Sequence, residues 1–310
     1  MVDGEWWVVR SGWWVMRDFG TRRATKLAGL ATALLLACGG CEKEEREDTR
    51  APRAVKVLPS HGGNLERIQA AKVLRIGVKT DAPPFCFQDK DGPPRGFDVD
   101  IGYRLARFLG VEPNFVPVAG PERIERLKHG DVDVVIATLT ATRRRARDVD
   151  FSLPYFQDQQ GLLVKADSPL QSYRDLAGRK VAAIAGSTSI DNLKVVSPDA
   201  ELVVVQSLYE AFEKLRSGAV GAVTGDGLQL QGLRLGAADG SAYRIAGEGF
   251  SVEPYVVGLP QNDSQFRARV DEFLTELWNS GAWTRLFNKW LGAQSPYNLE
   301  ARFQMPVLPP

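Results

Sequence analysis

Cysteine and histidine are scarce in this sequence, and their scarcity excludes several classes of protein. The 310 residues include three cysteines and two histidines. Two of the cysteines, Cys38 and Cys41, precede any segment with the pattern of a folded domain, so a disulfide framework is excluded. His61 and His129 stand alone, and no cluster of Cys, His and Asp has the spacing of metal ligands. Phosphate-binding loops and catalytic triads are also missing, so we predict no metal, no cofactor and no catalytic residue.

Long apolar runs and a strong net charge are missing as well. The formal net charge is +1, so the overall charge does not favour binding to nucleic acid. Residues 27–37 form an apolar run that is too short for a finished helix across a bilayer, and no other run is longer and as apolar. Hydrophobic residues make up 44% and charged residues 25% of the chain. This is the profile of a globular protein that can bury two modest cores.

The segment around residues 27–37 has the order of an export signal. Basic residues precede the apolar run, and the small residue Ala37 stands directly before Cys38. The sequence Leu35-Leu36-Ala37-Cys38 resembles a bacterial lipobox, which implies that Cys38 is acylated and becomes the new N-terminus; plain cleavage is the alternative. We therefore predict a signal peptide over 1–37. Because the tryptophan-rich residues 1–15 do not suit an export signal, we expect the true start at Met16.

Residues 38–64 are predicted to form a disordered tether. The stretch 42–50 is almost wholly charged, and Pro52, Pro59 and Gly62-Gly63 follow it. A segment of this composition cannot bury a core. If Cys38 is acylated, the tether holds the folded part of the chain at the periplasmic side of the membrane. If it is not, that part is soluble in the periplasm.

From Leu65 onward, short β-branched runs alternate with amphipathic stretches. This alternation predicts an α/β fold in which a mostly parallel sheet is flanked by helices. The junctions at Gly130 and Gly218, where a helix ends and a buried strand follows at once, suggest two lobes built alike. The expected strands are 73–78, 114–118, 132–137, 180–185, 202–205, 220–224 and 255–259. The expected helices are 98–109, 121–128, a short one at 172–178, 207–216 and two that follow the last strand.

Several motifs, each weak alone, follow one another in a specific order. They are Leu74-Arg75-Ile76-Gly77-Val78, Asp81, Gly96-Phe97-Asp98-Val99-Asp100, Phe151-Ser152-Leu153-Pro154-Tyr155 and Gly186-Ser187-Thr188. In this order they resemble the family 3 extracellular solute-binding proteins over about 65–291. The resemblance implies a type II periplasmic-binding-protein fold, in which two lobes joined by two crossing hinge strands hold a ligand in the cleft between them.

The resemblance also implies where the lobes begin and end. The two crossings are expected near 156–160 and 250–254. One lobe is then discontinuous and consists of 65–157 and 252–292, whereas the other is 158–251. Residues 293–310 remain as a C-terminal tail.

The activity implied by the resemblance is transport. The chain would be the extracytoplasmic component of an amino-acid ABC importer that captures a free polar amino acid by closure of the cleft. Its partners would be the ligand and the permease and ATPase complex, with no nucleic acid, membrane contact only through the lipid anchor, and a monomeric state. Two alternatives stay open: a periplasmic enzyme on the same fold, similar to cyclohexadienyl dehydratase, and a sensory ligand-binding module.

A zwitterionic ligand needs a cation for its carboxylate, because a charge buried without a partner costs several kcal/mol. The resemblance implies Arg145 in this role, with two parallel hydrogen bonds from its guanidinium. The neighbouring Arg144 makes a shift of one residue the main alternative. From the second lobe, Ser187 and Thr188 at a helix start are expected to bind the same carboxylate.

The ammonium group of the ligand needs an anion. The resemblance assigns it to Asp226, with the hydroxyl of Thr140 and the backbone carbonyl of Thr138 completing its hydrogen bonds. Leu139 lies between these two threonines and is included in the binding segment. The alternative for Asp226 is a helix N-cap, and one carboxylate can do both.

The side chain of the ligand is expected to meet Asp81, Phe85, Phe87 and the loop that contains Arg123. Arg123 is similar to a loop arginine in binders of acidic amino acids and favours glutamate or aspartate, unless it is a surface helix residue. Asp81 favours a basic or amide side chain instead. The identity of the ligand therefore stays open. Cys86, between the two phenylalanines, is interpreted as a core residue rather than a nucleophile.

Overall fold

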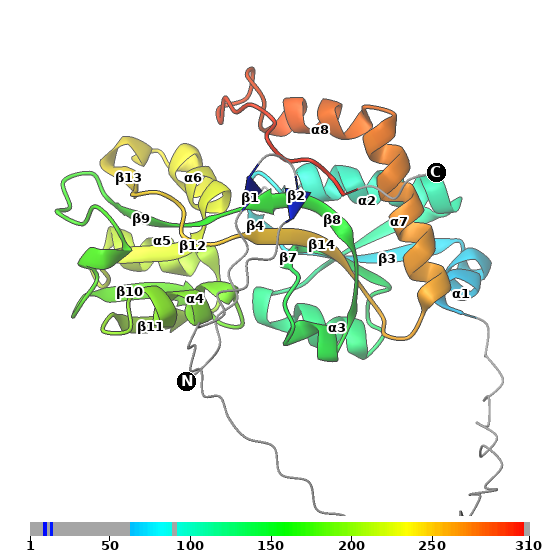
Figure 1. Cartoon of the computed structure of the whole chain (residues 1–310), viewed down its shortest axis with the longest axis horizontal. Coiled ribbons are helices and arrows are strands. Elements are labelled where there is room, and N and C mark those ends of the chain that lie inside the picture. The colour runs from blue at the N-terminus through cyan, green and yellow to red at the C-terminus, as the bar shows by residue number, and fades with distance from the viewer. Residues whose placement is uncertain (1–8, 11–12, 15–62, 89–91, 307–310) are drawn as a thin grey trace, which may run out of the picture. The chain divides into compact units, whose positions relative to one another are not determined.

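The computed structural model describes residues 9–10, 13–14, 63–88 and 92–306 (Figure 1). Cys38, most of the predicted signal peptide and nearly all of the predicted tether lie outside these residues. The chain divides into two compact units, Met1–Lys56 and Val57–Pro310. The first contains an antiparallel pair of short strands, β1 (Val9–Arg10) and β2 (Trp13–Trp14), and the second contains all other described elements.

Within the second unit, one lobe is built on a five-stranded sheet with the strand order β6-β3-β7-β14-β8. Its strands are β3 (Val73–Val78), β6 (Glu112–Pro117), β7 (Val134–Thr140), β8 (Asp150–Asp158) and β14 (Glu253–Leu259). Its helices are α1 (Asn64–Ala71), α2 (Phe97–Leu109), α3 (Arg123–Lys128), α7 (Ser264–Asn279) and α8 (Ala282–Trp290). Two 3-10 turns, η1 (Gly120–Glu122) and η2 (Arg145–Arg147), and a small hairpin of β4 (Asp81–Ala82) and β5 (Cys86–Phe87) complete the lobe.

The other lobe is built on a second five-stranded sheet, with the order β11-β10-β12-β9-β13. Its strands are β9 (Gln160–Lys165), β10 (Lys180–Ile184), β11 (Glu201–Val205), β12 (Ala222–Asp226) and β13 (Tyr243–Ala246). Its helices are α4 (Thr188–Val196), α5 (Leu208–Arg216) and α6 (Gly227–Gly236), with the 3-10 turns η3 (Tyr173–Asp175) and η4 (Gly240–Ala242). Figure 1 shows the two sheets, with the strands β8, β9 and β14 running between the lobes.

The chain passes twice between the sheets. It leaves the first sheet at the end of β8 and enters the second one residue later, after Gln159. It returns in the connection between Ala246 and Glu253. In the first sheet, β14 runs antiparallel to both of its neighbours, β7 and β8. In the second sheet, β9 likewise runs antiparallel to β12 and β13.

The α/β fold with two lobes agrees with the sequence analysis, but the sheets are mixed rather than mostly parallel. The parallel pairings are those of β3 with β6 and β7 and of β10 with β11 and β12. They belong to the predicted βαβ units. Within the two five-stranded sheets, every antiparallel pairing involves β9 or β14, the strands that begin directly after a crossing.

Local capping explains where several helices begin and end. The predicted helix 207–216 is α5, whose N-cap Ser207 accepts a hydrogen bond from the backbone N–H of Glu210 at 3.1 Å. The predicted helix at 172–178 is wrong, since only η3 forms there. Ser172 and Asp175 cap each other around this single turn, and the chain then turns at Gly178 with a φ of 65° instead of continuing as a helix.

Aromatic residues fill the core of the first lobe. Trp283 on α8 is 1% exposed, stacks on Phe287 at 5.4 Å and donates its indole N–H to the backbone carbonyl of Tyr155 at 2.7 Å. Phe273 on α7 and Phe287 on α8 belong to the same core. Cys86 is also buried in this core, and burial raises the pKa of its thiol far above the ordinary value, which makes it a poor nucleophile.

The segment after α8 returns to this core. Phe303 packs against Trp283 with ring centroids 5.5 Å apart, and Met305 is 5% exposed. Within the described residues, no helix has both the length and the apolarity needed to span a membrane.

Replacing Trp283 with alanine should lower the free energy of unfolding by about 3–5 kcal/mol, because the change leaves a large cavity and an unpaired carbonyl. Urea denaturation of the purified protein measures the loss. Trp290, which is partly buried at the end of the same helix, is the matched control, and Trp290→Ala should cost less. Equal losses for both variants would contradict the placement of Trp283 in the core.

Candidate functional site

A cavity lies between the two lobes at the carboxyl ends of the central strands. Its volume is about 30 Å³, which is room for little more than a water molecule, so the cleft is closed in this structure. The side chains that line it from the first lobe are Lys79, Arg123, Thr138, Thr140 and Arg145. Those from the second lobe are Ile184, Ser187, Thr188, Ser189, Leu208, Gly225, Asp226 and Gln229. Seven of the residues predicted from the sequence are thus brought together: Arg123, Thr138, Thr140, Arg145, Ser187, Thr188 and Asp226.

Arg145 joins the two lobes across this cavity. Its Nη1 donates to the carbonyl of Thr140 at 2.7 Å, and its Nη2 donates to the carbonyl of Gly186 in the second lobe at 2.9 Å. Burial, and then the charge of Arg123, lowers the pKa of Arg145 to about 9, so it stays charged at neutral pH. Among the residues that the structure describes, Arg145 has no carboxylate partner within ion-pair distance. A buried guanidinium held only by carbonyls favours the entry of an anion.

The exposure of the neighbouring arginines distinguishes Arg145 from Arg144 as the arginine of the cavity. Arg145 is 6% exposed, whereas Arg143, Arg144 and Arg147 are exposed. Arg144 instead forms an ion pair with Asp191 across the lobes, at 3.4 Å, on the outside of the cleft. Arg145 is therefore the arginine that lines the cavity.

Ser187 and Thr188 stand at the start of α4, as the sequence predicts. Their hydroxyl groups are already engaged: Ser187 donates to the carbonyl of Ile184 at 2.7 Å, and Thr188 donates to Glu253 at 2.8 Å. The backbone N–H groups of the first helical turn have no partners within the helix. A ligand carboxylate at this end of α4 would thus meet the backbone donors rather than the hydroxyl hydrogens.

Asp226 ends β12 and faces the cavity. Its Oδ2 accepts hydrogen bonds from the side-chain amide of Gln229 and from the hydroxyl of Tyr255, both at 2.7 Å. The same hydroxyl lies 3.2 Å from Asp158, whose carboxylate accepts the backbone N–H of Leu228 at the start of α6. Asp226 occupies the N-cap position of α6 but makes no capping bond with its side chain. Its carboxylate is therefore available to the cavity.

Burial shifts the protonation of this acidic pair. Desolvation raises the pKa values of both Asp226 and Asp158 above the ordinary range. The charge of Glu253 raises the pKa of Asp226 further, and the charge of Asp226 does the same to Asp158. A cationic ligand group beside Asp226 would favour its charged form.

Thr138 holds an unusual backbone conformation. Its φ is 46°, which is rare for a β-branched residue. The carboxylate of Asp98, fully buried below it, accepts the backbone N–H of Thr138 at 2.9 Å, and Nη1 of Arg123 donates to its carbonyl at 3.0 Å. Burial raises the pKa of Asp98 to about 7. The carbonyl predicted to accept the ligand ammonium is thus bonded to Arg123 in the closed cleft, with one lone pair left.

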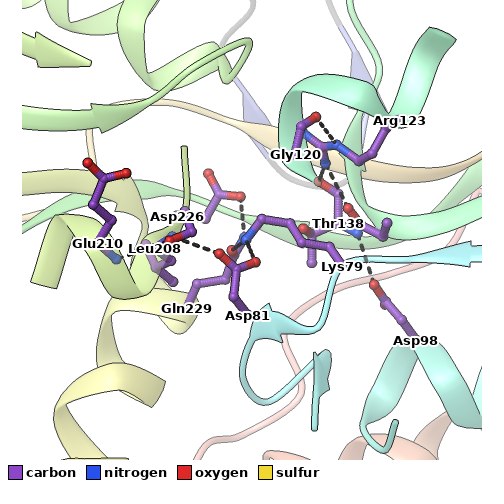
Figure 2. Close-up of polar contacts among 12 residues, drawn as sticks. Lys79, Asp81, Asp98, Gly120, Arg123, Thr138, Leu208, Glu210, Asp226 and Gln229 are labelled. Carbon is purple, nitrogen blue, oxygen red and sulfur yellow. Dashed lines mark hydrogen bonds and ion pairs between the residues drawn. The ribbon is translucent and has the colours of Figure 1, made fainter. Parts of the chain in front are cut away.

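Figure 2 shows a cluster of charged and amide groups formed by Lys79, Asp81 and Gln229. The ligand side chain is predicted to lie near Asp81. Nζ of Lys79 lies 2.7 Å from Oδ1 of Asp81 and 3.3 Å from Oε1 of Gln229. Oδ2 of Asp81 accepts the backbone N–H of Leu208, from the second lobe, at 2.7 Å. Although burial opposes it, the pair with Lys79 lowers the pKa of Asp81 below the ordinary value. Asp81 is therefore a bridge between the lobes and a partner of Lys79, beside the cavity rather than on its wall.

Arg123 is buried, so the interpretation as a surface helix residue is wrong. It is 5% exposed and lies beneath the cavity, where Nε donates to the carbonyl of Gly120 at 2.9 Å and Nη1 to the carbonyl of Ala137 at 2.7 Å. Within the described part of the chain, its Nη2 has no hydrogen-bond partner. Burial lowers its pKa from the ordinary value, and the nearby Asp226 and Asp81 counteract that shift.

Three predicted residues lie away from the cavity. Phe85 is fully buried in the first core, with its ring 5.0 Å from that of Phe156, and Phe87 packs against Trp290 at 5.9 Å. Leu139 is also fully buried, because alternate residues of β7 point to opposite faces and those facing the cavity are Thr138 and Thr140.

Lys79 and Gln229 line the cavity but were missed by the sequence analysis. Lys79 directly follows β3, so its place at the carboxyl end of a central strand was a usable signal. Gln229 stands three residues after Asp226, on the same side of α6. Both positions become meaningful only once Asp226 is known to face the cavity.

The fold and this cavity are those of a binding protein with a ligand cleft between two lobes. The family model of the bacterial extracellular solute-binding proteins, family 3, matches residues 74–293, and the chain belongs to this family.

This chain is similar along most of its length to two relatives and to one solved structure. The chain is 33% identical to the "ABC transporter glutamine-binding protein GlnH" of Bacillus subtilis (strain 168), over 84% of this chain and 93% of the relative. It is 36% identical to the "Glutamine-binding protein" of Geobacillus stearothermophilus, over 77% of this chain and 93% of the relative. The solved structure of "an ancestral arginine-binding protein bound to glutamine" is 35% identical, with a TM-score of 0.68, and the match covers 71% of this chain and 98% of that one.

The raised pKa of Asp226 gives a test of its predicted contact with a ligand ammonium group. Binding of the cation needs the charged carboxylate, so affinity for an amino acid should fall as the pH drops from about 7.5 to about 5 and Asp226 takes up a proton. Calorimetric titration across this range measures the change. Asp226→Asn should bind weakly at every pH, with a flatter profile. A wild-type affinity that is constant over the range would contradict this contact.

Proposed function

We propose that this chain captures a free polar amino acid between its lobes and delivers it to the permease of an ABC importer. The observation that carries the proposal is the position of Arg145, a buried cation that contacts both lobes. The carboxylate of Asp226 lines the same cavity. These are the two charges that a zwitterion requires. The names of the glutamine-binding relatives support the same conclusion.

Closure of the cleft is part of the proposed mechanism. The ligand carboxylate would take the place of a carbonyl at Arg145 and would also meet the N–H groups at the start of α4. The ammonium would lie against Asp226 on the second lobe and the oxygen of Thr140 on the first. Since these contacts exist together only when the lobes are close, binding favours the closed form.

The charges at the other end of the cavity narrow the choice of side chain. Lys79 already pairs with Asp81, and Arg123 presents an Nη2 without a hydrogen-bond partner among the described residues. A cationic ligand side chain would face both Lys79 and Arg123 in a site of low dielectric. We therefore propose a side chain that ends in an acceptor oxygen, either the amide of glutamine or the carboxylate of glutamate.

Binding without turnover fits the state of Asp81, the acid that an enzyme on this fold would need as a proton donor. Its two oxygens are engaged by Lys79 and by the backbone of Leu208, and its pKa is lowered. A carboxylate held in its charged form is a poor general acid. The proposal also includes export across the membrane, a lipid anchor at Cys38 and a monomeric state. Its first lobe consists of residues 65–157 and 252–292, and its second lobe of residues 158–251.

A thermal-shift screen of the purified protein against the twenty amino acids tests the proposed function. Glutamine or glutamate should raise the Tm by several degrees, whereas arginine and lysine should not. Arg145→Ala should weaken binding by about 100-fold or more, and Arg145→Lys by about 10-fold, because lysine keeps the charge but not the paired hydrogen bonds. The exposed Arg143→Ala is the matched control and should bind as the wild type does. A folded protein that responds to no amino acid would contradict the proposal.

The lipid anchor is tested by cell fractionation. In a bacterial host, the wild-type protein should sediment with membranes and be released by detergent, because a dually acylated cysteine anchors stably. Cys38→Ala should abolish this association, whereas Cys41→Ala should leave it unchanged. Membrane association that survives the Cys38 substitution would rule out this anchor.

A further inference from the structure

A buried carboxylate outside the cavity wall collects hydrogen bonds at the second crossing. Glu253 begins β14 and is 1% exposed. Its Oε2 accepts the hydroxyls of Thr140 and Thr188, both at 2.8 Å. Its Oε1 accepts the side-chain amide of Asn192 at 3.0 Å and the hydroxyl of Ser251 at 2.8 Å. Four donors on one carboxylate use its full capacity as an acceptor.

These donors come from both lobes. Thr140 ends β7 and is paired directly with Tyr255 of β14, so it belongs with Glu253 to the first lobe. Thr188 and Asn192 lie one turn apart on α4 of the second lobe. Separation of the lobes therefore removes Thr188 and Asn192. Thr140, and Ser251 two residues before Glu253 in the connection between the lobes, stay beside the carboxylate.

Gln160, at the start of β9 and fully buried, joins this network from the first crossing. Its Nε2 donates to the hydroxyl of Thr188 at 2.8 Å, and its Oε1 accepts the amide of Asn192 at 2.9 Å. The backbone N–H of Gln160 also donates to the hydroxyl of Ser251, at 3.1 Å. Both connections between the lobes are thus tied to Glu253 and to the start of α4.

Resting on the proposed function, we propose that Glu253 is a positioning residue that couples closure of the cleft to binding of the ligand. It stabilises the closed form by gathering donors from both lobes, and it orients the pocket hydroxyl of Thr140. Because that hydroxyl gives its hydrogen to Glu253, its oxygen can only accept a hydrogen bond from the ligand. An acceptor at this point suits an ammonium group and disfavours a carboxylate there.

The closed form gains from this arrangement even without a ligand. A buried carboxylate with four donors is fully hydrogen-bonded, and its charge lies near the N-terminal end of α4, where the helix dipole favours an anion. In the open form, water must replace the two donors of α4. The substitution Glu253→Gln has nearly the same size, but its amide nitrogen cannot accept a hydrogen bond, so part of the network is lost.

Small-angle scattering of the ligand-free protein tests closure without depending on any ligand. Glu253→Gln should have a larger radius of gyration than the wild type. Asn192→Ala, which removes one donor of the second lobe without touching the cavity wall, should shift the radius in the same direction by less. The exposed Glu248→Gln in the same connection is the matched control and should scatter as the wild type does. Equal radii for the wild type and Glu253→Gln would overturn the closure role.

The kinetics of binding test the coupling to the ligand. With glutamine or glutamate in stopped-flow measurements, Glu253→Gln should weaken affinity by about 10- to 100-fold, with most of the change in the dissociation rate. The double variant with Asn192→Ala should be little weaker than Glu253→Gln alone, because both changes break one network. A variant with a lower Tm but wild-type dissociation would overturn the proposal in favour of a merely structural role. If the wild type binds no amino acid, the proposed function fails, and the ligand-free scattering still decides whether Glu253 favours closure.

Discussion

The structure depends on the cost of holding charges in a cleft with room for very little water. Arg145 is buried, charged at neutral pH and bonded only to carbonyl oxygens, one from each lobe. Such a cation is stable only if the lobes stay close or if an anion replaces the carbonyl. The same constraint applies to Asp226 on the opposite wall, whose carboxylate is held by Tyr255 and Gln229. A zwitterion with its carboxylate and ammonium in the right order satisfies both.

The path of the chain makes this site possible. Since β8 and β14 are neighbours in one sheet and lead directly into the other lobe, rotations at these two adjacent connections would open or close the whole cleft. Polar residues at these connections, Gln160, Ser251 and Glu253, bond to the first turns of α4, where the ligand carboxylate is proposed to lie. The hinge and the binding site are therefore parts of one hydrogen-bond network. In the proposed mechanism, contacts of the ligand and contacts of the hinge stabilise the same closed state.

Much of the fold and part of the cavity could be predicted from the sequence, because the patterns that specify them lie within short segments of the chain. The alternation of β-branched runs and amphipathic stretches predicts the βαβ units, and Ser207 predicts the start of α5. Ordered motifs placed Arg145, Asp226 and the start of α4 at the ends of strands that meet in one cavity. The antiparallel edges of the sheets were missed because periodicity carries no information about strand direction.

The differences between the predicted and the observed lining of the cavity come from side-chain direction and from distant partners. Leu139 stands between Thr138 and Thr140, which line the cavity, but neighbours on a strand face opposite ways. Phe85 lies in the turn of the small hairpin, and its ring is buried in the core of the first lobe. Lys79 and Glu253 were missed because their importance depends on partners more than a hundred residues away, Gln229 and Thr140. Such pairings exist only in the folded chain. Which residues a motif contains can be predicted from sequence more readily than which way their side chains point.

A crystal structure of the protein with glutamine or glutamate bound tests the central claim most directly. The account predicts density between the lobes, with the carboxylate of the ligand on Arg145 and the N–H groups of α4, and its ammonium on Asp226 and the oxygen of Thr140. Density for the amino acid in the opposite orientation, or in a different cavity with Arg145 still bonded to the carbonyls of Thr140 and Gly186, would contradict it.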